Sequence, residues 1–316
     1  MKVLITGAAG FLGSHLSKDL IDQGHNVLGI DCKLSPTSQV FDINSKEFQA
    51  ALVEFQPQIL IHLAGVQYSE RVKKKTRDIF FQENVSMAKS LSNCLVHLDE
   101  LEHIVFVSTD MVYGKINFSP VSESMEPKPL GPYGKSKLAA EKILLEGSNS
   151  YNKVLTIFRP RLIAGPGRKG TLFTLGKLIK RNLPVPIFGA GLNRYQLISK
   201  YDVCDAISKA ISARANGVFN LGSDNPPTVR DLISNLISSM HSRSPMIFLP
   251  NALLLATLRA LDRINLAPLS PEQFEIAGID YVLSTELAKS KLLGWTPRFS
   301  DKDMMLESIR ALDTES

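Results

Sequence analysis

The chain has 316 residues and a formal net charge of +5. With 44% hydrophobic and 21% charged residues, its composition excludes global disorder and the fibrous classes. The longest strongly apolar stretch, Ala252–Leu258, is far shorter than the ~20 residues that a membrane span needs, so no span is expected. Three widely spaced cysteines are typical of a reducing compartment, and we expect a cytoplasmic protein.

The first half of the chain alternates short runs rich in Val, Ile and Leu with helical patterns. The expected strands are 2–6, 26–31, 59–64, 104–108 and 154–159, and the expected helices between them are 11–23, 46–55, 77–97 and 133–146. Parallel strands that helices cover on both faces have this continuous apolar character. The sequence therefore predicts an α/β fold with a Rossmann-type, doubly wound parallel sheet. Ligands of such sheets bind outside the carboxyl ends of the strands.

Helical patterns predominate in the second half of the chain. The expected helices are 172–181, 201–213, 228–241, 252–264 and 301–312, and the expected short strands are 186–188 and 218–221. We therefore expect a Rossmann domain over residues 1–165, to which segment 201–222 returns, and a smaller, mainly helical substrate lobe over residues 166–316. A lobe above the carboxyl edge of the sheet forms a cleft, the usual place for a substrate.

Three glycines with the spacing Gly7-x-x-Gly10-x-x-Gly13 follow the first expected strand and open a helix. Glycine at these positions lets the backbone approach a pyrophosphate closely, and the positive end of the helix attracts its charge. Asp31 ends the second expected strand, where an acid accepts hydrogen bonds from the adenosine ribose and disfavours a 2′-phosphate. The pattern predicts that residues 1–165 bind NAD in preference to NADP.

A tyrosine and a lysine, Tyr133 and Lys137, are four residues apart in an expected helix and therefore lie on one face. A neighbouring cation favours the phenolate of a tyrosine. Thr109 follows the fourth expected strand and brings a hydroxyl to the same edge of the sheet. A base, its activator and a hydrogen-bond donor beside a nicotinamide suit hydride transfer at a secondary alcohol or ketone.

With this glycine motif, acid, threonine, tyrosine and lysine, the sequence resembles an extended short-chain dehydrogenase/reductase of the NAD-dependent epimerase/dehydratase family. The segments that carry the resemblance are TGAAGFLG, Asp31, HLAG (62–65), Asn84, STDMVYG (108–114), YGKSK and RPRLIAGPG (159–167). They occur in the order and spacing of the family, and the likeness extends over essentially the whole chain. As a set they are specific for the fold and the cofactor, and much less so for the substrate.

The resemblance implies a set of NAD contacts along the carboxyl edge of the sheet. The glycines would bracket the pyrophosphate, Asp31 would hold the adenosine ribose, and the 42–43 pair would lie near the adenine. The implied cofactor-binding residues are Gly7, Gly10, Phe11, Leu12, Gly13, Asp31, Asp42, Ile43, Leu63, Ala64, Gly65, Asn84, Val107, Tyr133, Lys137 and Arg159. The resemblance implies no metal site.

Catalysis is assigned by the same resemblance. Tyr133 would be the acid/base, Lys137 would hold the nicotinamide ribose and lower the pKa of Tyr133, and Thr109 would bind the reacting oxygen. Asp110 completes the expected catalytic set. The implied substrate-binding residues are Thr109, Tyr133, Arg161 and Arg194. Family members often form a homodimer through two long helices, here 77–97 and 133–146, and we expect the same.

Three departures from the family pattern bear on the substrate. Met111 stands where 4,6-dehydratases of the family carry a proton-transferring Glu, which disfavours that mechanism. Leu162 stands where many nucleotide-sugar members have Asn. The arginine that often grips the substrate diphosphate would align near Arg194 or Tyr195, with the register off by one. Arg161 and Arg194 are therefore either substrate ligands or members of surface ion pairs.

The leading hypothesis is an NAD-dependent nucleotide-sugar epimerase that transiently oxidises and re-reduces a sugar carbinol. One alternative is an NAD(P)H-dependent reductase of a 4-keto-6-deoxy nucleotide sugar, and another is a hydroxysteroid-dehydrogenase-like enzyme for an apolar alcohol. A third is a non-catalytic dinucleotide sensor, which the presence of both Tyr133 and Lys137 disfavours. The basic run at residues 71–77 lacks an aromatic platform, so we expect a solvated face and no nucleic-acid partner.

Overall fold

The computed structural model describes residues 1–316 except 68–76, 169–170, 265, 268 and 312–316. Most of the basic run at residues 71–77 therefore lies outside the described residues. Among the described residues, no helix combines the length and the apolar character that crossing a bilayer requires.

The larger part of the molecule is a seven-stranded parallel sheet in the order β10-β6-β5-β4-β1-β2-β3. Its strands are β1 (Lys2–Thr6), β2 (Asn26–Asp31), β3 (Gln39–Val40), β4 (Ile59–His62), β5 (His103–Val107), β6 (Val154–Pro160) and β10 (Gly217–Leu221). Strand order reverses at β1, which pairs with β2 on one side and β4 on the other. This is the doubly wound arrangement that the sequence predicts, so the predicted fold class is confirmed.

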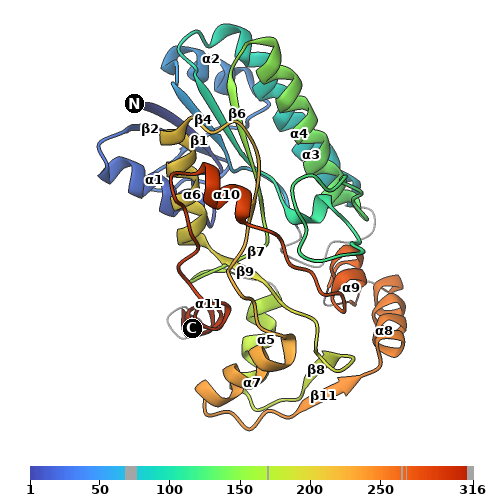
Figure 1. The fold of residues 1–316 in the computed structure, drawn as a ribbon. Coiled ribbons are helices and arrows are strands. Elements are labelled where there is room, and N and C mark those ends of the chain that lie inside the picture. Colours follow the sequence, from blue (N-terminus) through green and yellow to red (C-terminus); the bar gives the residue numbers. More distant parts are fainter. Residues whose placement is uncertain (68–76, 169–170, 265, 268, 312–316) are drawn as a thin grey trace.

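Helices cover both faces of this sheet (Figure 1). They are α1 (Gly13–Asp22), α2 (Lys46–Phe55), α3 (Arg77–Cys94), α4 (Pro132–Ser150), α6 (Lys200–Ala213) and α10 (Glu286–Lys291). Successive strand residues point to opposite faces. Val3 and Ile5 of β1 accordingly pack in the core of α1 and α6, whereas Leu4 packs in that of α2, α3 and α4. This double burial explains why apolar residues follow one another directly in the central strands instead of alternating with polar ones.

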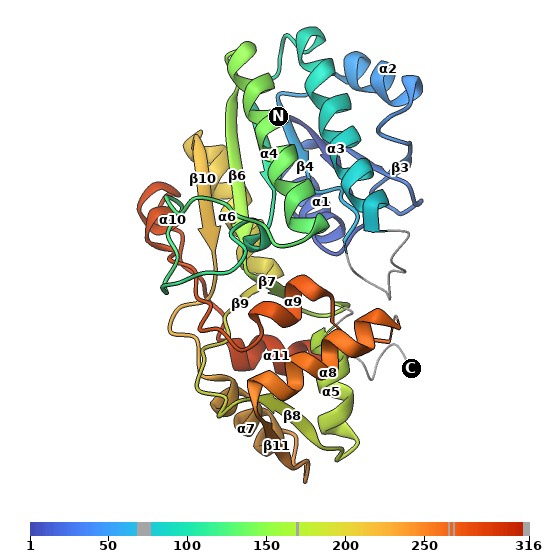
Figure 2. The same ribbon diagram turned by 90° about the vertical axis from the view of Figure 1, so that its right-hand side faces the viewer.

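The second, smaller part lies beyond the carboxyl ends of the strands (Figure 2). Its elements are β7 (Leu162–Ala164), α5 (Thr171–Lys180), β8 (Val185–Phe188), β9 (Leu197–Ser199), α7 (Val229–Ser239), β11 (Met246–Leu249), α8 (Asn251–Arg263), α9 (Pro271–Ile276) and α11 (Asp301–Arg310). β7 pairs with β9 and β8 with β11 in two small parallel sheets. Helices α5, α7 and α11 enclose a separate apolar core. The smaller part thus faces the carboxyl edge of the large sheet, where ligands are expected to bind.

Candidate active site

The glycine-rich turn joins β1 to α1 with very little room for side chains. Gly7 has a φ of +76°, and a Cβ there would lie 2.7 Å from the backbone nitrogen of Ala64. A Cβ on Gly13 would overlap the carbonyl oxygen of Gly7. Within the described part of the chain, the backbone N–H groups of Phe11 and Leu12 have no hydrogen-bond acceptor. The turn therefore offers amide donors at the start of a helix, which suits a pyrophosphate.

Asp31 lies at the end of β2, beside this turn. One carboxylate oxygen accepts a hydrogen bond from the Ala9 backbone N–H at 3.0 Å, and the other accepts one from the Lys33 N–H at 3.0 Å. The carboxylate is thus fixed at the sheet edge while part of it stays open to solvent. Together with the glycine turn, this geometry fits the adenosine ribose and pyrophosphate of NAD.

Other residues predicted to contact the cofactor differ in how available their side chains are. Ile43 and Val107 are buried in the core. Asp42 uses one carboxylate oxygen to accept a hydrogen bond from the Asn44 N–H at 2.9 Å. Leu63, Ala64 and Gly65 follow β4, and Gly65 lies next to the Lys137 ammonium. These last three line the edge where the cofactor is expected, and their roles stay predictions.

Asn84 links three segments around the site. Its amide oxygen accepts from the Val66 N–H at 2.8 Å, and its amide nitrogen donates to the Val66 carbonyl and to the Ser136 hydroxyl. The Ser136 hydroxyl in turn donates to the carbonyl oxygen of Tyr133 at 2.7 Å. These bonds let the Asn84 side chain hold the 66 segment and α4 in place, and its direct contact with NAD stays a prediction.

The side chain of Arg159 is likewise engaged by other protein groups. Its guanidinium is buried and makes two hydrogen bonds to the Glu141 carboxylate, the shorter at 2.6 Å. Burial lowers the pKa of Arg159, but the bonds to Glu141 outweigh this effect and the pKa is raised. The guanidinium also packs on the ring of Tyr113. This pair links β6 to α4 in the interior, and a contact of residue 159 with the cofactor stays a prediction.

The phenol of Tyr133 and the side chain of Thr109 come together at the carboxyl edge of the sheet. Tyr133 lies in the first turn of α4, Thr109 follows β5, and the two side chains form a hydrogen bond. The Thr109 hydroxyl also donates to the Asp110 carboxylate at 3.2 Å. A carbinol oxygen placed between the phenol and the threonine hydroxyl would have a proton acceptor and a hydrogen-bond partner.

The resemblance implies that Lys137 lowers the pKa of Tyr133, whereas in this structure the net pKa of Tyr133 is raised. The pKa of Tyr133 is raised to about 12, chiefly by burial. The carboxylates of Asp110 and Glu272 contribute to this rise, and the charge of Arg168 and the bond with Thr109 oppose it. Burial also lowers the pKa of Lys137 to about 7, against the effect of Glu141. The Lys137 ammonium lies over the ring of Phe106, 4.2 Å from the ring centre, a contact that favours the charged form but does not offset burial.

A cavity of about 410 Å³ opens beside these groups, within the range usual for small-molecule sites. Ser108, Thr109, Asp110 and Tyr133 lie at its polar end. The remaining wall comes from β7, α5, β8, α7, α8 and α9 and is mostly aliphatic. The smaller part of the molecule thus forms most of the cavity, and the large sheet supplies its reactive end.

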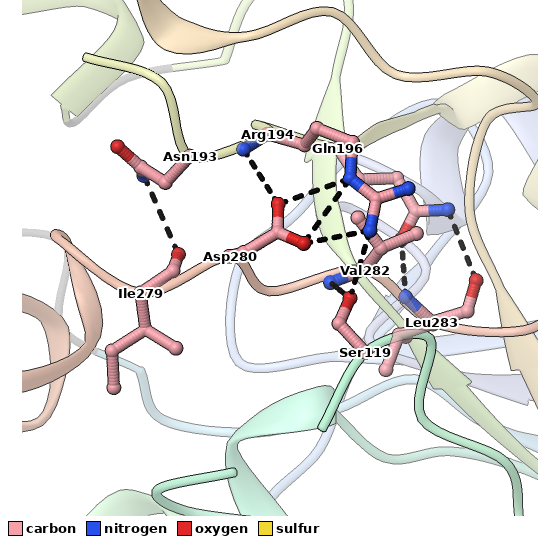
Figure 3. A network of polar contacts seen from close by, with 8 residues as sticks. All are labelled: Ser119, Asn193, Arg194, Gln196, Ile279, Asp280, Val282 and Leu283. Atoms are coloured by element: carbon pink, nitrogen blue, oxygen red, sulfur yellow. Dashed lines mark hydrogen bonds and ion pairs between the residues drawn. The ribbon is translucent and has the colours of Figure 1, made fainter. Parts of the chain in front are cut away.

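The two arginines predicted to bind substrate have different positions. Arg161 lines the cavity and donates to the Asp110 carboxylate at 2.6 Å. Arg194 does not line it: Figure 3 shows its guanidinium held by Asp280, with a shortest distance of 2.6 Å. Tyr195, the next residue, faces the cavity instead. Neighbouring residues of an extended segment point to opposite sides, so Arg194 points away from the cavity when Tyr195 faces it. The structure therefore does not place Arg194 where the predicted substrate contact requires it.

Two residues at the site were not predicted from the sequence. Glu272 of α9 accepts hydrogen bonds from the backbone N–H groups of Tyr133 at 3.0 Å and Gly134 at 3.2 Å, so it caps α4. Arg168 packs on the ring of Phe11, donates to the Gln67 side chain at 3.3 Å and interacts electrostatically with Tyr133. In the sequence, each is a charged residue directly after a proline or a glycine, and nothing else in its neighbourhood indicates a role at the site.

Gly13→Ala is expected to weaken NAD binding by about tenfold or more. The added Cβ would overlap the Gly7 carbonyl and displace the turn, and overpacking of this kind costs ~1–3 kcal/mol. Calorimetric titration with NAD measures the effect. Gly24→Ala is the control, because its Cβ would meet nothing within 4 Å, although its φ of +82° strains the turn. A folded Gly13→Ala protein with wild-type NAD affinity would contradict this account of the turn.

Glu272→Gln is expected to move the acidic limb of the pH profile of kcat/KM to lower pH. The carboxylate of Glu272 raises the pKa of Tyr133, so removing its charge lowers that pKa and leaves more phenolate at a given pH. The matched control is Glu275→Gln on the same helix, since Glu275 pairs with Arg259 instead. An unchanged limb in Glu272→Gln, or the same movement in both variants, would show that Glu272 does not act on Tyr133.

The strand order, the glycine turn and the tyrosine at the sheet edge define an enzyme of the extended short-chain dehydrogenase/reductase class. The chain belongs to the NAD dependent epimerase/dehydratase family, whose model matches residues 3–222. This match confirms the predicted resemblance, the prediction of an enzyme, and NAD as its cofactor.

Individual relatives agree with the family. A UDP-glucose 4-epimerase of Mycolicibacterium smegmatis is 29% identical over 73% of this chain and 80% of its own. An uncharacterized protein of Sinorhizobium fredii, y4nG, is 28% identical over 96% of this chain and 77% of its own. The crystal structure of UDP-glucuronic acid 4-epimerase from Bacillus cereus in complex with NAD superposes with a TM-score of 0.80 at 23% identity, covering 100% of this chain and 99% of that one. The last likeness shows the fold.

Proposed function

We propose that this protein is an NAD-dependent epimerase that acts on a secondary carbinol of a nucleotide sugar. The observation that carries the proposal is the meeting of the Tyr133 phenol and the Thr109 side chain at the polar end of the cavity. Tyr133 takes the hydroxyl proton of the carbinol and later returns it, and Thr109 holds the reacting oxygen. Bound at the glycine turn and Asp31, NAD would supply the hydride acceptor for the carbinol carbon and the hydride donor for its re-reduction, so that the reaction has no net redox change.

The relatives and one local feature support epimerisation. Relatives from several organisms are named UDP-glucose 4-epimerases. Met111 lines the cavity beside Asp110, and a thioether does not transfer protons, so elimination next to a keto group is disfavoured. The nucleotide sugar as substrate rests on the names of these relatives.

A second candidate function is net oxidation or reduction of an apolar alcohol. The observation that favours it is the cavity wall, where Leu162, Leu254 and Leu258 are exposed to the substrate space. The reductase of a 4-keto-6-deoxy nucleotide sugar has no comparable structural support.

The test is incubation of the purified protein and NAD with a panel of nucleotide sugars. Chromatography of the products and absorbance of reduced cofactor are followed together. Conversion without accumulation of NADH supports the epimerase, and stoichiometric NADH production contradicts it.

We also propose a homodimer that forms through α3 and α4, in the cytoplasm. Figure 1 shows these helices side by side on one face of the molecule, where Ile79, Phe81 and Leu145 are exposed large apolar side chains. Such residues are typical of an interface between subunits. The three cysteines, all among the described residues, are free thiols, as expected in a reducing compartment. Sedimentation velocity measures the oligomeric state, and a monomer at micromolar concentration would contradict the dimer.

A further inference from the structure

Asp110 and Arg161 form an ion pair directly beside the reacting groups. The Nη1 atom of Arg161 lies 2.6 Å from one carboxylate oxygen of Asp110, and the two side chains are only 11% and 5% exposed. The guanidinium also lies over the ring of Tyr281, whose hydroxyl donates to the Asp110 carbonyl oxygen at 3.0 Å. Asp110 is therefore held in place both at its carboxylate and at its backbone.

Stability alone is a poor explanation for this pair. Removing two charges from water offsets most of their attraction, so apolar residues of similar volume often stabilise a protein as well. Within the part of the chain that the structure describes, the Nε atom of Arg161 is shielded from solvent and has no hydrogen-bond partner, which costs further free energy. Both residues line the cavity, so their charges act where a substrate would react.

The Thr109 hydroxyl connects this pair to the phenol of Tyr133. A hydroxyl has one proton to donate and two lone pairs that accept. Thr109 donates to the second carboxylate oxygen of Asp110 at 3.2 Å, and it accepts from the Met111 N–H at 3.3 Å. Its bond with Tyr133 then uses the remaining lone pair, which suits a phenol O–H but not a phenolate. The carboxylate and the phenolate thus compete for one proton.

This competition matters for the proposed proton transfer. As the carbinol proton moves to the phenolate, the carbinol O–H bond breaks and the O–H bond of Tyr133 forms. The phenolate must be present beforehand, and a hydrogen-bond donor beside it favours that form. A carboxylate that an arginine already neutralises is a weaker acceptor. By binding one oxygen of Asp110, Arg161 therefore makes the Thr109 proton available at the reactive end of the cavity.

We infer that Arg161 is a positioning residue for Tyr133, because it holds the Asp110 carboxylate so that the Thr109 hydroxyl can donate to the phenolate. The inference rests on the proposed function, in which Tyr133 is the base. It assigns to Arg161 an effect through Asp110 and Thr109 in place of the predicted contact with substrate. Arg161 and Asp110 exchange no proton with the carbinol in this scheme.

The test measures ionisation of the Tyr133 phenol without a substrate. The NAD-saturated protein is labelled with 3-fluorotyrosine, which ionises at lower pH than tyrosine, and the ¹⁹F resonance of residue 133 is assigned by its loss in Tyr133→Phe. Arg161→Met leaves the Asp110 charge unpaired, so the titration midpoint is expected to rise by about one pH unit. Asp110→Asn leaves the Arg161 charge unpaired, so the midpoint is expected to fall.

Two further variants separate charge from packing. Arg161→Lys keeps the cation, and its midpoint is expected to lie closer to wild type than that of Arg161→Met. The double variant Arg161→Met/Asp110→Asn removes both charges, and its midpoint is expected to lie between those of the two single variants. A residue that only fills space would give neither the opposite signs nor the rescue by lysine.

The matched control is Arg298→Met, which leaves another buried carboxylate without its arginine. The Nε atom of Arg298 lies 3.2 Å from the Asp202 carboxylate, and neither of these two described residues lines the cavity. The midpoint of residue 133 is expected to stay unchanged in this variant. Other charged side chains that act on Tyr133 or share its helix face are kept in every variant: Lys137, Arg168 and Glu272.

The outcomes separate this inference from the proposed function. Midpoints that move in the same direction in Arg161→Met and Asp110→Asn, or in neither, would overturn the inference even where nucleotide sugars are converted. Opposite movements support it, and absence of sugar conversion by the wild type would then overturn the proposed function alone. If circular dichroism shows that one single variant does not fold, the other and Arg161→Lys decide: a midpoint without the expected sign, or no rescue by lysine, overturns the inference.

Discussion

Tyr133→Phe is expected to lower kcat by about 10²–10⁴-fold, the usual contribution of a general acid/base. The phenylalanine keeps the ring and its packing and removes only the hydroxyl that bonds with Thr109. The proton of the carbinol then has no positioned acceptor, since the neighbouring Asp110 carboxylate is committed to Arg161. NAD affinity is expected to change by less than about tenfold, the size of one neutral hydrogen bond.

Initial rates and a calorimetric NAD titration on the same protein samples check this expectation. Tyr151→Phe is the control, because Tyr151 follows the end of the same helix and is 41% exposed. It is expected to retain wild-type kcat and NAD affinity. If Tyr133→Phe kept wild-type kcat, the proton would have to be carried by another group, and both the proposed mechanism and the site assignment would be wrong.

Local sequence signals were enough for the longer strands of the large sheet but not for the shortest strands of either part. β1 and β2 have the predicted bounds, because short runs rich in Val, Ile and Leu between turn residues are recognisable without knowledge of their neighbours. β3, β7 and β9 have only two or three residues each, and their extended form depends on the strands beside them. The predicted helix 77–97 ends instead as α3 and a 3₁₀ turn at Leu95–His97.

Site residues followed the same division. Gly7, Gly13 and Asp31 are found at the turn and strand end where their spacing places them. Arg194 was misplaced because its direction depends on the pairing of Tyr195 with Tyr281, a contact across 86 residues that spacing does not contain. Glu272 reaches the Tyr133 backbone across 139 residues of chain. Its effect on the pKa of Tyr133, like that of burial, could be known only from the folded structure.

Glu141→Gln is expected to reduce the free energy of unfolding by about 3–5 kcal/mol, the usual cost of leaving one member of a buried ion pair without its partner. The Glu141 carboxylate accepts two hydrogen bonds from the Arg159 guanidinium and one from the Ser108 hydroxyl at 2.5 Å, all in the interior. Glutamine has the same shape but carries no charge, and its amide N–H would face the guanidinium. Urea unfolding followed by circular dichroism measures the change.

The matched control is Glu146→Gln, since Glu146 lies on the exposed side of the same helix. Its effect is expected to stay within about 0.5 kcal/mol. The double variant Glu141→Leu/Arg159→Met should be more stable than Glu141→Gln, because it buries neither charge. Glu141 also raises the pKa of Lys137, so Glu141→Gln should lower that pKa further below its ordinary value. A Glu141→Gln protein as stable as wild type would mean that water reaches the Arg159 guanidinium. That result would contradict a buried Arg159–Glu141 pair between β6 and α4.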